Sequence, residues 1–303
     1  MTFNLIVILG PTASGKTQLA ARLARDRGSE IISADSRQVY RGMDIGTGKD
    51  LSQYVIDGSA VSCHLIDIVD PEYEFSVFDY QVNFSRVFTN ISSRGVVPIM
   101  VGGTGLYIEA AINGYRFMEV PENPSLRREL EDEGMEELRN RLIELKPTVH
   151  NTTDLLDRKR LMRAIEIMEF TRVHNCHESR FPSIVPLAVG IRWERSVLRQ
   201  RITDRLNERL EAGMIEEVES LYQSGIGWDK LNFFGLEYRY IGLYLRGEMS
   251  YWEMFQKLNT RIHQFAKKQE TWLRRMEKRG TTIHWINGGD YYEAAEIINK
   301  LMK

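Results

Sequence analysis

A glycine-rich segment near the start of the chain carries the first residues that can do chemistry. Residues 10–17, GPTASGKT, match the pattern G-x-x-x-x-G-K-[ST] in full. The backbone N–H groups can surround an anion, Lys16 supplies a mobile cation, and the Thr17 hydroxyl can ligate Mg²⁺. The pattern leaves open which phosphate ester binds and whether a phosphoryl group is transferred. We expect a phosphate or diphosphate site made of Gly10, Pro11, Thr12, Ala13, Ser14, Gly15, Lys16 and Thr17.

A second polar cluster consists of Asp35, Ser36, Arg37 and Gln38. Asp35 can act as a general base or hold a metal-bound water, and its three neighbours offer donors and acceptors that suit the edge of a base. The alternative is structural: Asp35 caps a helix and Arg37 is solvated.

A third cluster, VGGTG at 101–105, has glycines that permit a ligand to approach the backbone closely. It also presents the hydroxyl of Thr104. A tight glycine-rich turn without a binding role is the alternative.

Each cluster follows a short apolar segment that predicts a buried strand. These segments are residues 3–9, 30–33 and 96–101, and residues 187–193 form a fourth. Helical patterns lie between them, one from Lys16 to about residue 26. Strands that alternate with helices favour a parallel sheet, in which ligands bind at the C-terminal ends of the strands. We therefore expect an α/β fold: a parallel sheet of the P-loop NTPase type, flanked by helices.

The pattern of alternating strands and helices is interrupted in the middle of the chain. Residues 116–182 contain charged amphipathic helices, at about 125–146 and 155–172, and no comparable strand. We expect a helical insertion there, between the two parts of a catalytic core at 1–115 and 183–303. After Trp193 the pattern is helical almost to the end.

Composition limits the class of protein. The net charge is −2, with 43% hydrophobic and 27% charged residues, as in ordinary globular proteins. No apolar run is long enough for a membrane span, and the start does not resemble a signal peptide. The isolated Cys63 and Cys176 argue against structural zinc and disulfides, and so suit the cytoplasm. Residues 261–279 hold seven basic residues against Glu270 and Glu277, which suits contact with phosphates or, alternatively, a solvated helix face.

Seven segments together resemble one family, the tRNA dimethylallyltransferases, also called tRNA isopentenyltransferases. They occur in the family's order and span nearly the whole chain, and the second is the most specific. The segments are GPTASGKT at 10–17, SADSRQVYRGMDIGTGK at 33–49, HLIDIVDP at 64–71, VGGTGLYIEA at 101–110, DRKRLMRAIE at 157–166, RITDRLNERLEAGMIEEVESL at 201–221 and AKKQETWLRR at 266–275.

The resemblance implies a specific reaction. Enzymes of this family move a dimethylallyl group from dimethylallyl diphosphate to the exocyclic amine of adenosine 37, beside the anticodon, in tRNAs that read codons beginning with U. Diphosphate is released, and Mg²⁺ is the expected cofactor. The expected partners are therefore the tRNA anticodon stem-loop and the prenyl diphosphate, with no membrane. A cytoplasmic monomer is the expected form.

The resemblance also implies roles for individual residues. Lys16, Thr17 with Mg²⁺, the loop N–H groups and Arg201 would stabilise the departing diphosphate, and Asp35 would accept the proton of the amine, with Thr104 nearby. The acceptor adenosine, turned out of its stack, would be held by the second cluster. Grip on tRNA would come from Asp35, Ser36, Arg37, Gln38, Thr104, Arg158, Lys159, Arg160, Arg163, Lys267, Lys268 and Arg274.

Three positions depart from the family's pattern. Gly48-Lys49-Asp50 stands where the family usually has Ala-Lys-Pro, residues 237–240 replace Gly-Tyr-Lys-Glu, and Ile262-His263 replaces Thr-Arg. The last two bear on tRNA contacts more than on diphosphate chemistry, and suit a divergent paralogue. Two other functions remain open: a P-loop kinase for a nucleoside or metabolite, and a tRNA-binding paralogue without catalysis.

Overall fold

The computed structural model describes residues 3–115, 119–145, 155–174 and 181–302. The chain forms two compact units. One, here the core unit, comprises residues 1–115 and 181–303, and the other, the helical unit, comprises residues 116–180.

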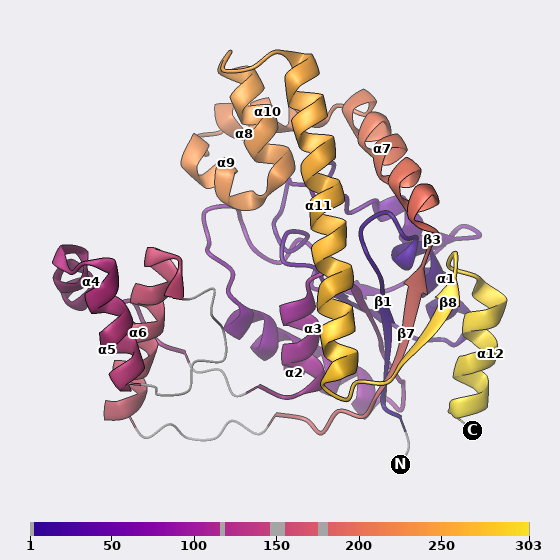
Figure 1. Cartoon of the computed structure of the whole chain (residues 1–303). Coiled ribbons are helices and arrows are strands. Elements are labelled where there is room, and N and C mark those ends of the chain that lie inside the picture. Colours follow the sequence, from indigo (N-terminus) through magenta and orange to yellow (C-terminus); the bar gives the residue numbers. More distant parts are fainter. Residues whose placement is uncertain (1–2, 116–118, 146–154, 175–180, 303) are drawn as a thin grey trace. The chain divides into compact units, whose positions relative to one another are not determined.

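The core unit is built on a six-stranded sheet in the order β5-β2-β6-β1-β7-β8, in which every neighbouring pair is parallel (Figure 1). The four apolar segments of the sequence form the four central strands of this sheet. The residues of β1, β6, β2 and β7 are nearly all buried, as the apolar runs predict. The strands are β1 (Leu5–Leu9), β2 (Ile31–Ala34), β5 (Cys63–His64), β6 (Ile99–Gly102), β7 (Pro186–Arg192) and β8 (Ile283–Asn287), and a separate antiparallel pair joins β3 (Val55–Ile56) to β4 (Ser59–Ala60).

Helices cover both faces of this sheet. Alternate residues of β1 point to opposite sides: Leu5 and Val7 pack against one set of helices, whereas Ile6 and Ile8 pack against α1 and α12. The apolar cluster that contains Leu5 and Val7 takes residues from α2, α3, α7, α8, α9, α10 and α11. The helices are α1 (Lys16–Asp26), α2 (Val77–Ser93), α3 (Gly105–Ile112), α7 (Arg195–Glu211), α8 (Met214–Gln223), α9 (Trp228–Phe234), α10 (Leu236–Leu245), α11 (Tyr251–Lys278) and α12 (Tyr291–Leu301), with a 3₁₀ turn at Leu51–Tyr54.

Two expectations about these elements need correction. The part after Trp193, expected to be helical almost to the end, is helical as far as Lys278, but β8 then extends the sheet beside β7 before α12 begins. The third strand starts at Ile99 rather than at residue 96. Pro98 precedes it and has no N–H to donate, although its carbonyl accepts a bond from Ile6.

The helical unit has a small core of its own. Its elements are α4 (Pro124–Asp132), α5 (Met135–Leu145) and α6 (Arg158–Val173). The helix expected at 125–146 is two helices, interrupted at Gly134, and residue 146 lies outside the described residues. The apolar faces meet in one cluster of Leu126, Leu130, Leu138, Leu142, Leu161 and Ile165. No helix in the described parts of either unit is both long and apolar enough to cross a membrane.

Candidate active site

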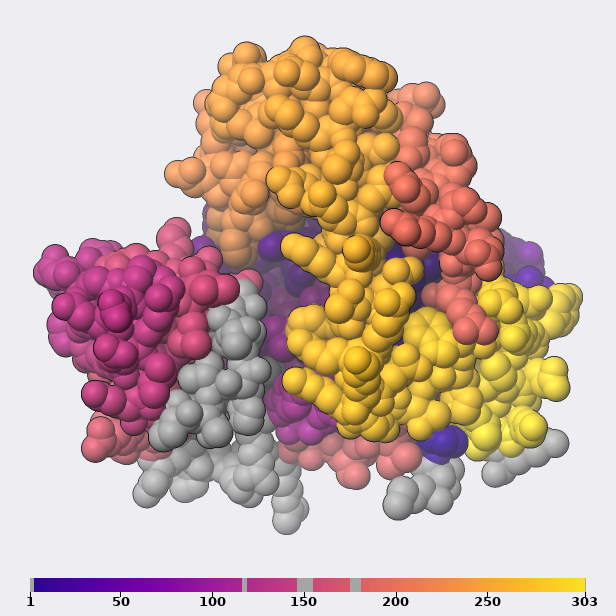
Figure 2. Space-filling model, in the orientation of Figure 1, coloured from indigo at the N-terminus to yellow at the C-terminus, as the bar shows by residue number. Residues whose placement is uncertain are grey.

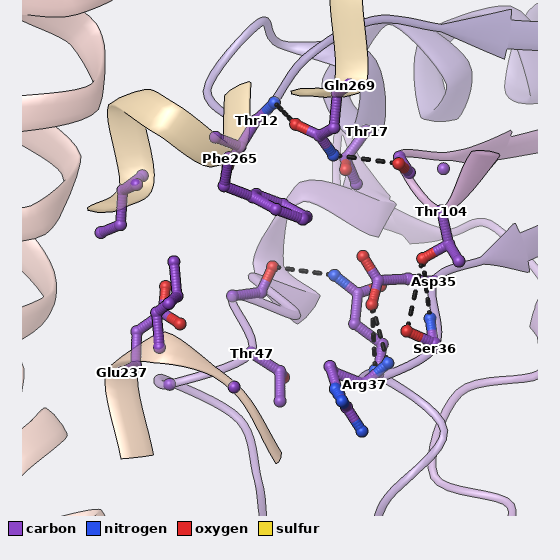
Figure 3. A pocket seen from close by; sticks show the side chains of 18 of the residues that line it. Thr12, Thr17, Asp35, Ser36, Arg37, Thr47, Thr104, Glu237, Phe265 and Gln269 are labelled. Carbon is purple, nitrogen blue, oxygen red and sulfur yellow. Dashed lines mark hydrogen bonds between the residues drawn. The ribbon is translucent and has the colours of Figure 1, made fainter. Parts of the chain in front are cut away.

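The three polar clusters of the sequence converge on one cavity of the core unit. Because β2, β6 and β1 are neighbours and parallel, the loops that follow them leave the same edge of the sheet. The cavity measures about 280 Å³. Its wall comprises residues 35–38, 46–48, 101–104 and 234–237, together with Thr12, Lys16, Thr17, Tyr54, Arg205, Arg209, Ile262, Phe265 and Gln269 (Figure 3).

The phosphate loop connects β1 to α1 as its motif predicts. Gly15 stands just before α1 with a φ of 88°, a backbone angle that favours glycine, so the helix begins at Lys16. Lys16 Nζ donates to the Pro11 carbonyl over 2.6 Å. Arg201, from α7, donates its Nε to the Ala13 carbonyl at 2.9 Å and stacks on the Trp193 ring, 4.5 Å from the centroid. The predicted Lys16 and Arg201 therefore both contact this loop.

Burial, and after it the neighbouring guanidinium of Arg205, lower the pKa of Lys16 to about 7, although Asp35 acts in the opposite direction. Near neutral pH the free protein thus holds this amine only partly charged. A dianionic or trianionic group on the loop would favour its protonated form. Phosphate binding is therefore expected to take up a proton.

Asp35 lies at the end of β2 and is not a helix cap. Its Oδ1 accepts bonds from the backbone N–H groups of Arg37, at 2.9 Å, and Gln38, at 3.4 Å, so that it forms a local turn. No described residue donates a hydrogen bond to Oδ2. The side chain lies in the cavity wall (Figure 3). The carboxylate is thus held by one oxygen and keeps the other for a ligand.

The neighbours of Asp35 are also fixed. Thr104 accepts the backbone N–H of Ser36 on its Oγ1 at 3.1 Å, which joins the second and third clusters. The Arg37 guanidinium stacks on the Phe233 ring, 4.6 Å from the centroid. Gln38 donates its amide N–H to the Gly48 carbonyl at 3.1 Å.

Sequence analysis missed Gln269, which links two of the loops. Its Oε1 accepts the N–H of Thr12 at 2.8 Å, and its Nε2 donates to the Gly103 carbonyl at 3.0 Å (Figure 3). The residue is buried although it lies on α11. A signal was present, since the AKKQETWLRR segment contains it. One glutamine thus connects the phosphate loop to the third cluster.

Two arginines of α7, Arg205 and Arg209, also line the cavity and were missed. Arg205 donates to Asp50 at 2.6 Å and to the Gly48 carbonyl at 3.2 Å. Arg209 lies 3.5 Å from Glu237, and burial lowers its pKa while burial raises that of Glu237. A signal was present, since the segment quoted at 201–221 contains both at i, i+4 spacing after Arg201.

The basic residues expected to grip tRNA are of two kinds. In the helical unit, Arg158 donates to the carbonyls of Leu130 and Glu131, and Arg163 pairs with Glu166. Lys159 and Arg160 are exposed. The first two side chains therefore hold the helical unit together, and the last two are open to a partner.

The same division holds on α11, whose outward surface runs along the visible face of the core unit (Figure 2). Arg275 and Arg279 pair with the buried Glu109, and so fix α11 against α3. Lys267, Lys268 and Arg274 are exposed and form no ion pair with any described residue. His263 packs against Thr203, 3.4 Å away, and is not part of the cavity wall.

A second cavity, of about 680 Å³, also includes Lys16 and Thr17 in its wall. The rest of its wall comes from the phosphate loop, residues 44–45 and 49–53, and α7, including Arg201. The phosphate loop is thus open to two cavities. Among the described residues, no group of three or more His, Cys, Asp or Glu side chains is placed to hold a metal ion.

The chain is similar to known proteins over nearly its whole length. A family model described as IPP transferase matches residues 38–276, and one described as isopentenyl transferase matches residues 3–60. The tRNA dimethylallyltransferase 1 of Syntrophus aciditrophicus (strain SB) is 62% identical over 96% of either chain. That of Geotalea uraniireducens (strain Rf4) is 58% identical, over 99% of this chain and 98% of the relative. A tRNA isopentenylpyrophosphate transferase from Bacillus halodurans has a similar solved structure, with a TM-score of 0.71 and 32% identity, covering 99% of this chain and 96% of that one.

Proposed function

The chain belongs to the IPP transferase family, whose curated members are tRNA dimethylallyltransferases, and from that premise we propose what its cavity does. It transfers the dimethylallyl group of dimethylallyl diphosphate to the exocyclic amine of adenosine 37 in tRNAs that read codons beginning with U. The C1–oxygen bond of the donor breaks, the diphosphate leaves with the electron pair, and a bond forms between C1 and the amine nitrogen.

The phosphate loop holds the leaving group. Lys16 and Arg201 flank the loop from two sides, and its N–H groups lie at the start of α1, where the helix dipole favours an anion. Charge that builds up on the diphosphate oxygens as C1 departs is stabilised by these fixed donors, and this lowers the barrier.

Asp35 receives the proton of the amine. Its Oδ1 is fixed by two backbone N–H groups, which leaves Oδ2 to accept a hydrogen bond from the attacking nitrogen. Such an anchored carboxylate orients the amine as well as accepting its proton. Thr104 and Ser36 lie beside it and form the edge of the acceptor subsite.

The residues of the loop fit a magnesium ion. Mg²⁺ commonly binds through one or two protein oxygens, substrate phosphates and water, so it needs no cluster of carboxylates. Thr17 would hold it, and the ion would neutralise charge on the diphosphate.

The exposed basic residues supply contacts to tRNA phosphates. We assign this role first to Lys159 and Arg160 of the helical unit and to Lys267, Lys268 and Arg274 of α11, because these are open to a partner. Arg158 and Arg163 then contribute indirectly, since they maintain the helical unit.

The observation that supports this assignment most is the meeting of Lys16, Asp35 and Thr104 in one cavity, from loops that follow three neighbouring strands. A diphosphate bound at Lys16 and an amine held at Asp35 would leave the prenyl C1 between them. The P-loop alone would suit many phosphate esters. The carboxylate at its side, in a cavity also lined by Phe265, suits transfer to a base.

The decisive experiment offers purified protein, Mg²⁺ and radiolabelled dimethylallyl diphosphate to a tRNA that reads a codon beginning with U. We expect label in the tRNA and isopentenyladenosine in its nucleoside digest. A transcript with guanosine at position 37 is the matched control and stays unlabelled. Label that appears equally in the control would contradict the assigned acceptor.

The two other functions predict different results. A kinase would bind ATP more tightly than dimethylallyl diphosphate in a calorimetric titration and would consume ATP. A paralogue without catalysis would bind tRNA and donor but produce no isopentenyladenosine. Turnover therefore separates them from the proposed prenyl transfer.

A further inference from the structure

Glu217, on α8, lies outside the cavity but holds one of its walls. Its Oε2 accepts the backbone N–H groups of Asp44, at 2.8 Å, and Ile45, at 2.6 Å, and its Oε1 accepts that of Gly46 at 2.9 Å. The Tyr238 hydroxyl adds a fourth bond at 2.8 Å. No Lys, Arg or His within the described residues pairs with this carboxylate. Three consecutive backbone donors therefore balance its charge, as in an anion-binding nest.

Tyr238 also contacts the segment that Glu217 holds, at Gly46. A Cβ on Gly46 would lie 2.6 Å from the Cζ atom of the Tyr238 ring, so the backbone lies directly against the hydroxyl end of this ring. Burial, and then the Glu217 charge, raise the pKa of Tyr238, which keeps its hydroxyl a donor. Neither Glu217 nor Tyr238 belongs to the cavity wall.

The segment that Glu217 holds leads to the Gly48 carbonyl, which contacts both the acceptor side and the phosphate side of the cavity. The Gly48 carbonyl accepts from Gln38 at 3.1 Å, on the acceptor side, and from Arg205 at 3.2 Å, on the phosphate side. The turn between is closed by Gly48 N–H to the Ile45 carbonyl, at 3.1 Å, and by Lys49 N–H to the Asp44 carbonyl, at 3.0 Å. A shift at residues 44–46 is thus transmitted to the Gly48 carbonyl.

We propose that Glu217 is a positioning residue of the transfer reaction, acting through the Gly48 carbonyl. The inference rests on the function proposed above. The Glu217 carboxylate fixes the position of the Gly48 carbonyl. This carbonyl in turn fixes Gln38 beside the acceptor and Arg205 beside the donor. Since a displacement of about 1 Å at a reacting centre can cost about 100-fold in rate, the anchor is expected to matter for turnover more than for folding.

The test compares Glu217→Gln with Glu216→Gln, a change of the exposed neighbour in the same helical turn. Glutamine has the shape of glutamate, but it carries no charge and presents an N–H to backbone N–H groups. We expect kcat/KM for tRNA to fall about 100-fold in the first variant and to stay within about twofold in the second. Both are assayed well below their melting temperatures, so that a stability loss does not reduce the folded fraction.

A double-mutant cycle distinguishes positioning from general destabilisation. If Glu217 acts through the loop, Glu217→Gln combined with Gln38→Ala is little worse than the more damaging single change, although the two side chains do not touch. Multiplicative losses in the double variant would overturn the proposal. Tyr238→Phe, which removes one of the four bonds, serves if Glu217→Gln does not fold, and we expect a smaller loss, of about threefold.

The wild-type reaction separates this inference from the function it rests on. If the wild-type protein makes no isopentenyladenosine, the proposed function fails. If it does and Glu217→Gln matches it in kcat and in both KM values, the positioning role alone is wrong.

Discussion

The phosphate loop and the segment 44–50 both contribute residues to the wall of one cavity, but they take their shape in different ways. The loop at 10–17 is shaped by its own glycines and by the helix that follows it, with Gly15 at a positive φ. The segment 44–50 has no regular structure before the 3₁₀ turn. It is held from outside, by Glu217, Tyr238 and Arg205.

This difference teaches where function can be found in a sequence. A loop that shapes itself leaves a motif with a local physical reason, whereas the motif at residues 33–49 does not reveal the distant residues that hold segment 44–50. The departures from the family pattern illustrate the second case. Asp50 has a φ of 43°, which proline cannot adopt, so the chain takes a path here that Ala-Lys-Pro does not allow. The carboxylate that results pairs with Arg205.

The largest effect is expected at the phosphate loop. Lys16→Ala removes the cation that the phosphate loop contributes, and we expect kcat/KM for dimethylallyl diphosphate to fall about 10³-fold, because a fixed donor to the leaving group is lost. Steady-state kinetics with saturating tRNA measures it. The control is Lys267→Ala, an exposed lysine on α11 outside the cavity, whose donor kinetics should not change. A loss below tenfold in Lys16→Ala would argue that the diphosphate binds elsewhere.

Asp35→Asn should cost about 100-fold in kcat, since the proton acceptor is removed while a side chain of equal shape remains. The KM for the donor is expected to stay near its wild-type value, because Asp35 faces the acceptor. Single-turnover measurement with donor bound first isolates the chemical step. If the variant retains full kcat, Asp35 does not take the proton.

The lowered pKa of Lys16, about 7 in the free protein, predicts how donor-site affinity depends on pH. Diphosphate binding favours the charged lysine, so affinity should decline above pH 7, by up to about tenfold per pH unit. Calorimetry with pyrophosphate at pH 8, in buffers of different ionisation enthalpy, should detect proton uptake. Lys16→Arg stays charged and should lose this uptake. Uptake that is equal in both proteins would assign it to another group.

The externally held segment is tested by Gly48→Ala, for which a Cβ would lie 1.5 Å from Arg209 Nη2. Gly42→Ala is a matched control, since Gly42 has a similar φ of 69° against 64°, but no atom lies within 4 Å of its added Cβ. Both should lose about 1 kcal/mol of unfolding free energy to backbone strain, measured by urea denaturation. Only Gly48→Ala should also lose about tenfold in kcat/KM. Equal kinetics in the two would remove the role assigned to this segment.

The smallest effects are expected at the tRNA surface. Arg160→Ala should weaken tRNA binding a fewfold and lower the slope of log affinity against log salt by about 1, as expected for one phosphate contact. Arg163→Ala should instead lower the stability of the helical unit, because its partner Glu166 is buried. Filter binding across a salt series, together with thermal melts, measures both. Identical salt slopes in wild type and Arg160→Ala would remove that arginine from the contact.

Sequence alone predicted the parts of the site that local rules determine. The loop motif, the buried strands and the C-terminal placement of three clusters follow from short segments, and the structure brings them together in one cavity. The strand β8 was missed because it is only five residues long, shows no clean alternation of buried and exposed residues, and lies between two helices. Gln269 and Glu217 were missed as site residues because each acts on a segment more than 150 residues away in the chain. No pattern of spacing contains such contacts.

We assign the leaving group and the amine to different loops of one cavity. Calorimetry with dimethylallyl thiolodiphosphate, an analogue that resists ionisation, tests this assignment most directly in wild type, Lys16→Ala and Asp35→Asn. We predict that Asp35→Asn binds the analogue as tightly as wild type, and that Lys16→Ala binds it at least about 100-fold more weakly. Equal weakening in both variants, or full binding by Lys16→Ala, would contradict this division of the site.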